Sequence, residues 1–256
     1  MIFKNVMMKG VAILGLILLL GLTINACSPT MSWKEEVKLN DGRVIVLNRH
    51  FNLGGYPTLD ASERTPLDET ITFTLPDSSK TISWKTEFND RVPEPNSLSP
   101  LLLDVVGGIP YLATSPAGCI AYNKWGRPNP PYILYKYVNN EWMRVPLKEL
   151  PVMLVQGNLI GKPASSLLKP YYTVEAAKAE REDGNVINYE KTILRETVKD
   201  AGGSRCGEMV YDGKGGWIGI GWFRKKQSLK ACLNYCTQKK IESKYCPCGI
   251  LFKEKE

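Results

Sequence analysis

The sequence contains one histidine, His50, and lacks the short motifs that usually mark hydrolytic, metal or redox sites. Chemistry that depends on several histidines is therefore excluded. There is no G-x-S-x-G nucleophile motif, no H-E-x-x-H zinc motif and no D-x-D-x-D-G calcium loop. There is also no C-x-x-C redox pair and no C-x-x-C-H haem motif. We therefore predict no catalytic residue, no metal ligand and no cofactor.

The composition excludes two broad classes of protein. With 43% hydrophobic and 23% charged residues, the 256-residue chain is neither a disordered tail nor a multi-span membrane protein. One or two globular domains fit this length. The 26 Asp and Glu residues leave one catalytic alternative open, because glycoside cleavage needs only two carboxylates and the sequence does not say which they would be.

The first 26 residues have the pattern of an export signal. Lys4 and Lys9 precede an apolar stretch at residues 10–24, whose 15 residues would extend roughly 22 Å as a helix against about 30 Å of bilayer hydrocarbon. Residues 24–27, Ile-Asn-Ala-Cys, resemble a bacterial lipobox. We therefore expect Cys27 to be lipidated and to anchor the mature chain in the membrane. Ser28 stands where Asp would favour retention in the inner membrane, so we expect the periplasmic face of the outer membrane.

Six further cysteines remain, an even number that favours disulfides in an oxidising compartment: Cys119, Cys206, Cys232, Cys236, Cys246 and Cys248. Their connectivity does not follow from the sequence alone. Cys232 and Cys236 would share one face of a helix, whereas Cys246 and Cys248 would alternate on an extended segment. Two disulfides could then join a C-terminal strand to a helix, leaving Cys119 to pair with Cys206. A four-cysteine metal site is the alternative, although its spacing departs from the usual C-x2-C zinc pattern.

Basic residues are concentrated near the C-terminus, and seven of them fall within residues 224–244: Arg224, Lys225, Lys226, Lys230, Lys239, Lys240 and Lys244. Because an exported protein does not meet nucleic acid, we expect no nucleic-acid partner. An acidic polysaccharide or anionic lipid headgroups are the accessible partners of such a patch. The alternative is that these residues form a solvated helix face.

Residues 32–152 have the pattern of strands and turns. Residues 70–75 alternate between apolar and Thr side chains, which is typical of a half-buried strand. Turn residues such as Asp41-Gly42 predict three hairpins, within residues 37–49, 70–84 and 132–145. The proline-rich residues 91–100 and 126–132 should form loops or sheet edges, because proline donates no hydrogen bond to a neighbouring strand.

Helical patterns follow this β-rich part. Thr173 can cap a helix over residues 174–182, residues 187–199 have helical spacing, and Ser228 can open an amphipathic helix that ends near Ile241. We therefore predict an α+β fold, with an antiparallel β-rich N-terminal half, a small sandwich or partly open barrel, followed by a helical, disulfide-linked C-terminal part. The expected units are a signal peptide at 1–26, an anchor and linker at 27–31, a β-rich domain at 32–152 and a cysteine-rich region at 153–256 that can pack on the same core.

An aromatic-rich stretch is the best candidate for a binding surface. Six Tyr and Trp residues fall within residues 122–142, next to polar residues in a loop rich in proline. Large rigid rings and Arg side chains bury area at a small entropic cost, so they suit a sugar-stacking or protein-binding surface. We single out Asn123, Lys124, Trp125 and Arg127; the alternative is that the rings belong to the core.

The string YNKWGRPNPPY at residues 122–132, with DGRVIV at 41–46 and ITFTLP at 71–76, resembles a group of proteobacterial lipoprotein-like proteins. The resemblance covers about residues 32–152. It implies an envelope lipoprotein and carries no catalytic or ligand residue with it.

Together these patterns predict a lipid-anchored envelope protein that acts as a binding or assembly module rather than an enzyme. The expected partners are the membrane, through Cys27, and an envelope protein or polysaccharide. The alternative is an envelope hydrolase that acts on cell-wall or surface glycan through carboxylates. The sequence does not indicate an oligomeric state.

Overall fold

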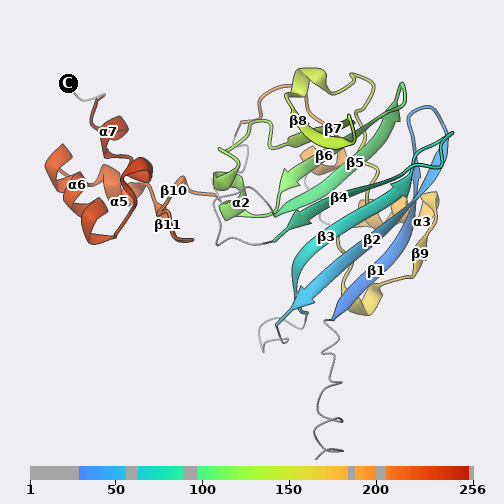
Figure 1. The fold of residues 1–256 in the computed structure, drawn as a ribbon, viewed down its shortest axis with the longest axis horizontal. Helices are drawn as coiled ribbons and strands as arrows, with labels where there is room; N and C mark the ends of the chain where they lie inside the picture. The colour runs from blue at the N-terminus through green and yellow to red at the C-terminus, as the bar shows by residue number, and fades with distance from the viewer. Residues whose placement is uncertain (1–28, 56–62, 89–96, 184–187, 200–205, 254–256) are drawn as a thin grey trace, which may run out of the picture.

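The computed structural model describes residues 29–55, 63–88, 97–183, 188–199 and 206–253. The predicted signal peptide and the lipidation site at Cys27 lie outside these residues. Within the described ranges, no helix is both long and apolar enough to cross a bilayer. The fold is mixed α+β, with antiparallel sheets in the first half and short helices toward the C-terminus, as the sequence predicts (Figure 1).

A five-stranded sheet in the order β4-β3-β2-β1-β9 forms one layer. The first four strands are antiparallel neighbours, and β1 turns into β2 at the predicted Asp41-Gly42 position, where Gly42 has a φ of 90°. β9 joins the far edge parallel to β1, with Lys34 opposite Tyr171. The strands are β1 (Thr30–Lys38), β2 (Val44–Gly54), β3 (Thr65–Thr74), β4 (Thr81–Glu87) and β9 (Tyr171–Tyr172).

A four-stranded antiparallel sheet in the order β5-β6-β7-β8 forms the second layer. The predicted turn between β7 and β8 is present, and both Asn139 and Asn140 have the positive φ that such a turn requires. Pro100 lies in edge strand β5 beside a shift of register, where its missing N–H is tolerated. The strands are β5 (Leu98–Val106), β6 (Ile109–Pro116), β7 (Ile133–Val138) and β8 (Glu141–Val145).

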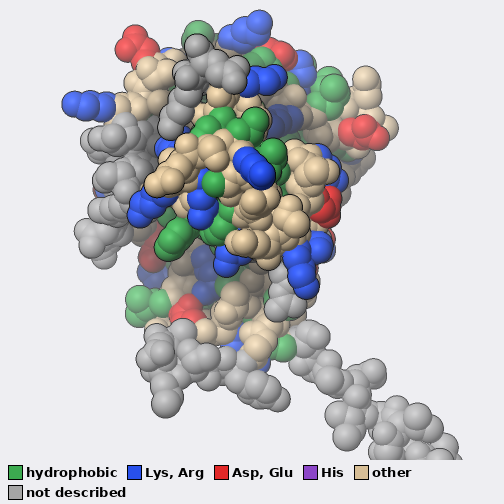
Figure 2. All heavy atoms as spheres, turned by 90° about the vertical axis from the view of Figure 1, so that its left-hand side faces the viewer, with side chains coloured by type: hydrophobic (Ala, Val, Ile, Leu, Met, Phe, Trp, Pro, Cys, Tyr) green, Lys and Arg blue, Asp and Glu red, His purple; other side chains and the backbone are tan. Residues whose placement is uncertain are grey.

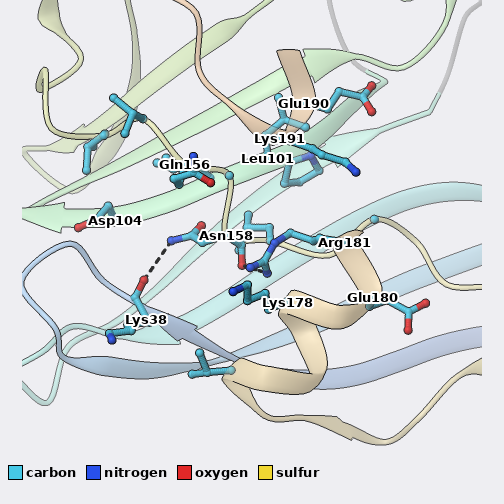
Figure 3. A pocket seen from close by; sticks show the side chains of 18 of the residues that line it. Lys38, Leu101, Asp104, Gln156, Asn158, Lys178, Glu180, Arg181, Glu190 and Lys191 are labelled. Atoms are coloured by element: carbon cyan, nitrogen blue, oxygen red, sulfur yellow. Dashed lines mark hydrogen bonds between the residues drawn. The ribbon is translucent and has the colours of Figure 1, made fainter. Parts of the chain in front are cut away.

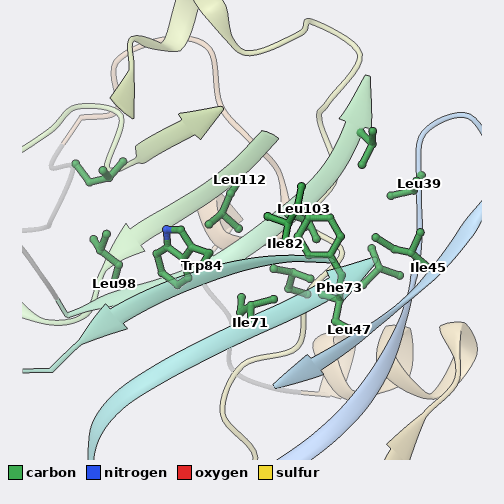
Figure 4. Close-up of a cluster of buried hydrophobic side chains, with 14 of the residues drawn as sticks. Leu39, Ile45, Leu47, Ile71, Phe73, Ile82, Trp84, Leu98, Leu103 and Leu112 are labelled. Carbon is green, nitrogen blue, oxygen red and sulfur yellow. The ribbon is translucent and has the colours of Figure 1, made fainter. Parts of the chain in front are cut away.

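The largest hydrophobic core lies between these two sheets. In Figure 4 the labelled side chains of both sheets fill the space between the layers, with Phe73 and Ile82 from one sheet facing Leu103 and Leu112 from the other. The strict alternation of β4 explains this arrangement, because every second side chain of the strand is buried. Burying one such side chain fully stabilises the folded state by about 1.5–3 kcal/mol. The core therefore holds the two sheets together as a sandwich.

A second core covers the other end of the five-stranded sheet. Here Trp33 and Phe51 of the sheet, stacked at 5.4 Å between ring centroids, contact Ile160, Tyr172 and Ala177 from the chain that follows the sandwich. The predicted helix α3 (Val174–Asp183) begins as expected, since the Thr173 hydroxyl accepts a hydrogen bond from the backbone N–H of Ala176. Two 3-10 helices, η1 (Leu147–Glu149) and η2 (Ser165–Leu167), lie between β8 and β9.

The helix predicted at residues 187–199 was wrong over most of its length. Only α4 (Asn188–Lys191) is helical, and the chain then runs alongside residues 153–157. The N–H of Ile193 donates to the carbonyl of Val155, and the Arg195 guanidinium donates to the carbonyls of Leu150, Pro151 and Leu154. These tertiary hydrogen bonds replace the local ones that a helix would make.

Residues 206–253 form a small separate cluster, which we call the C-terminal module; Figure 1 shows it in red and orange beside the sandwich, next to α2. Ser228 caps α6 through the N–H of Ala231, as predicted. The module consists of β10 (Met209–Tyr211), β11 (Trp217–Gly219), α5 (Gly221–Arg224), α6 (Leu229–Gln238), η3 (Ser243–Tyr245) and α7 (Cys248–Leu251).

Two disulfides hold this module, Cys232–Cys248 and Cys236–Cys246. They join α6 to the segment around Pro247. The C-terminal strand predicted for this segment was wrong, because η3 and α7 lie on either side of Pro247 and no strand forms between them. The third disulfide, Cys119–Cys206, connects the start of α2 (Cys119–Lys124) to the chain that leads into β10. It therefore ties the module to the sandwich.

Candidate functional site

A cleft opens along the edge where β1 and α3 of one layer face β5 of the other. Its volume is about 720 Å³, which falls within the range of about 300–1,000 Å³ that is typical of small-molecule sites. Apolar walls come from residues such as Leu101, Leu154 and Leu159, and polar groups come from α3, β1 and residues 156–162. Neither sheet alone would form this space.

Asn158 is the residue that holds the cleft together. Its side-chain amide accepts a hydrogen bond from the N–H of Leu103 at 2.9 Å and donates to the carbonyl of the same residue at 2.8 Å. The same amide reaches the carbonyl of Lys38 on β1 at 3.4 Å (Figure 3). Its own carbonyl accepts from the Arg181 guanidinium at 2.9 Å. Asn158 therefore connects β5 and β1 through its side chain and α3 through its backbone carbonyl.

Cationic side chains surround Asn158. Figure 3 shows Lys178 and Arg181 directed from α3 toward Asn158, whereas Glu180 of the same helix points away. Lys178 has only a long ion pair, 3.8 Å from Glu182, and both groups are largely exposed. Burial lowers the pKa of Arg181 below its usual range, while the nearby Glu35 and Glu182 carboxylates partly oppose this. A desolvated guanidinium of this kind is a strong hydrogen-bond donor for an anionic ligand group.

The carboxylates nearest the cleft walls already serve the fold. Asp104 is buried and accepts hydrogen bonds from the backbone N–H groups of Asn40 and Val105. Burial raises its pKa above the ordinary value. Glu36 accepts from the Tyr171 hydroxyl and from the N–H of Val174 at the start of α3. Both carboxylates therefore fix the backbone around the cleft.

A buried charge cluster lies directly behind the cleft wall. Arg49 is 1% exposed and binds both Glu35 and Glu69, with Nη1 at 2.7 Å from Glu35 Oε1 and Nε at 2.6 Å from Glu69 Oε1. Its guanidinium also lies over the Trp33 ring and donates to the carbonyl of Ile160. One cation offsets only one of two buried carboxylates, so burial, with the charge of Glu35 added, raises the pKa of Glu69.

The predicted binding residues lie elsewhere, at the joint between the sandwich and the C-terminal module. The Asn123 amide donates to the carbonyl of Gly207 and accepts from the N–H of Met209, and Arg127 donates to the carbonyl of Cys206. Trp125 is 9% exposed and belongs to the main core, with the Arg144 guanidinium over its ring. Lys124 ends α2 and is half-buried. The structure brings these residues together. Asn123, Trp125 and Arg127 contact other parts of the same chain, which is a structural role.

The two disulfides within the C-terminal module lie against each other. The Sγ atom of Cys248 lies 3.6 Å from Cys236 and 3.5 Å from Cys246, each outside its own disulfide. Both disulfides are formed, so these sulfurs already have covalent partners rather than free thiolates to offer a metal. The disulfide framework therefore accounts for all six cysteines.

Sequence reasoning missed Asn158, Lys178 and Arg181 because the cleft joins parts of the chain that are far apart. Asn158 and Lys38 are 120 residues apart in sequence. One local feature of the sequence marks this place, the pair Gly157-Asn158, because glycine is required where two backbone segments come very close. An added Cβ at Gly157 would lie 2.7 Å from the carbonyl oxygen of Glu190, so only glycine allows the chain to approach α4 this closely.

A scan against protein-family models, a search of curated proteins and a search of solved structures each returned no match to this chain.

Proposed function

We propose that this protein is a lipid-anchored envelope protein that faces the periplasm and acts as a non-catalytic binding module, with the cleft as its ligand site. The observation that supports this proposal is the built cleft itself, a space of about 720 Å³ whose walls come from both sheets and from α3. The export signal and the lipobox at Cys27 support the anchor. Three disulfides suit an oxidising compartment.

The chemistry of the cleft favours a ligand that is partly apolar and carries a negative group. Leucine side chains form part of its wall, while Lys178 and Arg181 point toward its centre. Apolar area supplies affinity, and a few charged donors fix the orientation of the ligand. A small amphipathic acid and an acidic, apolar segment of an envelope protein both have this chemistry.

Hydrolysis of a glycan is the alternative function, and the cleft favours it less. Retaining or inverting cleavage needs two carboxyl groups that can reach the substrate with their oxygens. Five carboxylates line the cleft, those of Glu180, Glu182 and Glu190 among them, and the other two, Asp104 and Glu36, each use their oxygens to hold backbone N–H groups. Both would have to give up structural hydrogen bonds before they could act on a substrate.

Site-specific photocrosslinking in intact cells tests the binding proposal. A crosslinking amino acid replaces Val155, which lines the cleft and is 42% exposed, and in a matched control replaces Val46, which is 41% exposed on β2 outside the cleft. We expect a defined adduct from position 155 and none from position 46, with the adduct identified by mass spectrometry. Identical adducts from both positions, or none from either, would contradict a ligand site in the cleft.

The anchor needs a separate test. Cells grown with a clickable palmitate analogue should label the wild-type chain, and the Cys27→Ser variant should carry no label and leave the membrane fraction. Labelling of the Cys27→Ser variant, or an unlabelled wild type, would contradict lipidation at this position. Neither result bears on the photocrosslinking experiment, so anchor and ligand site are tested independently.

A further inference from the structure

The charge of this protein is divided unevenly between its two parts. Residues 27–205 contain 21 Lys or Arg and 21 Asp or Glu, so their net charge is zero. The C-terminal module, residues 206–253, contains nine basic and three acidic residues, a net charge of +6. Figure 2 looks at the end of the molecule where the module lies and shows Lys and Arg side chains around hydrophobic ones, with few acidic groups. This part of the surface therefore attracts anions.

The module's three acidic residues are already engaged by their own neighbours. Glu208 pairs with Arg224 at 2.6 Å and Glu242 with Lys244 at 3.3 Å. Asp212 accepts hydrogen bonds from the N–H groups of Lys214 and Gly216 in the turn between β10 and β11. Among the described residues, no carboxylate therefore pairs with the following lysines: Lys225, Lys226, Lys230, Lys239 and Lys240.

Three of these lysines lie against aromatic rings. Lys226 Nζ is 4.1 Å and Lys239 Nζ 5.8 Å from the centroid of the Tyr235 ring, and Lys225 Nζ is 5.5 Å from that of Trp222. Cation–π contacts of this kind hold a charge in place without neutralising it. The ammonium groups are therefore positioned and still available to an anion.

The rings and two of the lysines line one groove. Its volume is about 460 Å³, and its walls are Trp217, Ile218, Gly219, Trp222, Lys226, Tyr235 and Lys239. Trp222 is 59% exposed, so a large part of its ring is accessible to a ligand. The indole N–H of Trp217, another residue of the groove, is buried and has no hydrogen-bond acceptor in the described chain.

We propose that this groove is a binding site for an acidic polysaccharide, one whose sugars carry carboxylate groups. The apolar C–H faces of a pyranose ring stack on Trp222 and Tyr235, and the carboxylates bind Lys226 and Lys239 by charge-assisted hydrogen bonds. A groove with rings and ammonium groups on its walls suits a chain of sugar rings better than a flat bilayer surface. The exposed leucines of α6, Leu229 and Leu233, are not among the residues that line the groove. This site is distinct from the cleft, and its test uses no cleft residue.

The experiment measures retention of the full-length chain, purified in a nonionic detergent, on immobilised polygalacturonate and on immobilised dextran, a neutral polymer. We expect binding to polygalacturonate only, weakened when sodium chloride rises from about 0.1 M to about 0.5 M. The double variant Lys226→Ala/Lys239→Ala should bind about tenfold or more weakly, because two charge-assisted contacts are lost. Trp222→Ala should also weaken binding, and Trp222→Phe should restore most of it.

Matched controls separate the groove from net charge alone. The double variant Lys34→Ala/Lys148→Ala removes two exposed charges from the sandwich and should bind as the wild type does. Equal losses in the two double variants, or no loss in either, would overturn the proposal. So would binding only to nanodiscs that contain phosphatidylglycerol, in a manner that depends on Leu233, since that result would assign the module to a lipid surface. Circular dichroism and the absence of free thiols establish that each variant is folded.

Discussion

The side-chain amide of Asn158 forms two hydrogen bonds with the backbone of Leu103, one to its N–H and one to its carbonyl. In this way an amide side chain does what a neighbouring strand would do for the free edge of β5. The same amide also reaches β1, so Asn158 links the two layers at this edge, as the hydrogen bond from Asn40 to Asp104 does nearby. The cleft is therefore a consequence of how the sandwich is closed, not a gap between independent parts.

Replacing Asn158 by Ala should lower the free energy of unfolding by about 2–3 kcal/mol, because it leaves part-buried backbone groups of β5 without partners. Urea unfolding followed by Trp fluorescence measures this change. Asn48→Ala is the matched control, since Asn48 is exposed on β2, and it should change stability by less than about 0.5 kcal/mol. Equal effects of the two substitutions would contradict the role given to Asn158.

Trp125→Ala should destabilise the protein by about 3–5 kcal/mol, because the ring belongs to the core between the sheets. Were Trp125 a surface binding residue, the same substitution would cost less than about 0.5 kcal/mol. Chemical denaturation of the purified variant distinguishes these cases. A stable Trp125→Ala protein that has lost a partner in cells would support the binding role predicted for the aromatic stretch.

Arg127 offers a milder test of the joint between the two parts. Its guanidinium donates to the carbonyl of Cys206 and lies over the Tyr122 ring. Arg127→Ala should therefore speed amide hydrogen exchange in the chain around Cys206 and Met209, while β2 and β3 keep wild-type protection. Unchanged exchange at the joint would show that the Cys119–Cys206 disulfide and the hydrogen bonds of Asn123 hold the module without Arg127.

The hairpins of the sandwich could be predicted from the sequence because their determinants are local. The alternation predicted at residues 70–75, which is seen as alternating burial on β3, and the Asp41-Gly42 turn depend on residues that are neighbours in the chain. The helix expected at 187–199 failed because Arg195 and Ile193 bind the backbone of residues 150–155 instead. The cleft has the same origin, since β9, α3 and Asn158 meet β1 only after more than one hundred residues.

The buried charges show a different limit of sequence reasoning. Glu35 and Arg49 occupy inward-facing positions of β1 and β2, where alternation predicts apolar side chains. In the register Arg49 is opposite Trp33 and Glu35 opposite Leu47, so the two charged side chains meet diagonally between neighbouring strands, and each offsets the cost of burying the other. Pairing of this kind depends on the register between β1 and β2, which could not be predicted from the sequence.

Nonreducing peptide mapping should recover three linked pairs and no free thiol: Cys119–Cys206, Cys232–Cys248 and Cys236–Cys246. Alkylation before reduction should therefore modify none of these six cysteines. Removing the pair that spans 87 residues, by Cys119→Ser/Cys206→Ser, should destabilise the protein by about 4.6 kcal/mol on the chain-entropy model. Six alkylated cysteines, or one zinc ion per chain, would contradict the disulfide framework.

Glu69→Gln should change how stability depends on pH. Burial, with the charge of Glu35 added, raises the pKa of Glu69 above its ordinary value of 4.5, although Arg49 opposes the shift. The folded state therefore holds this proton more tightly than the unfolded state does. Stability contributed by the protonated group is complete below about pH 4.5 and declines as pH rises through the raised folded pKa.

The Gln variant lacks this titration, so its free energy of unfolding should rise relative to wild type as pH increases from about 4 to 7. The rise should be about 1.4 kcal/mol for each unit by which the pKa of Glu69 is higher in the folded state than in the unfolded state. Urea unfolding at several pH values measures the difference. Glu141→Gln, at an exposed position on β8, is the control and should show a constant difference. A difference for Glu69→Gln that falls with pH would mean that Arg49 stabilises the Glu69 carboxylate more than burial disfavours it. The cluster behind the cleft would then hold two ionised carboxylates on one guanidinium.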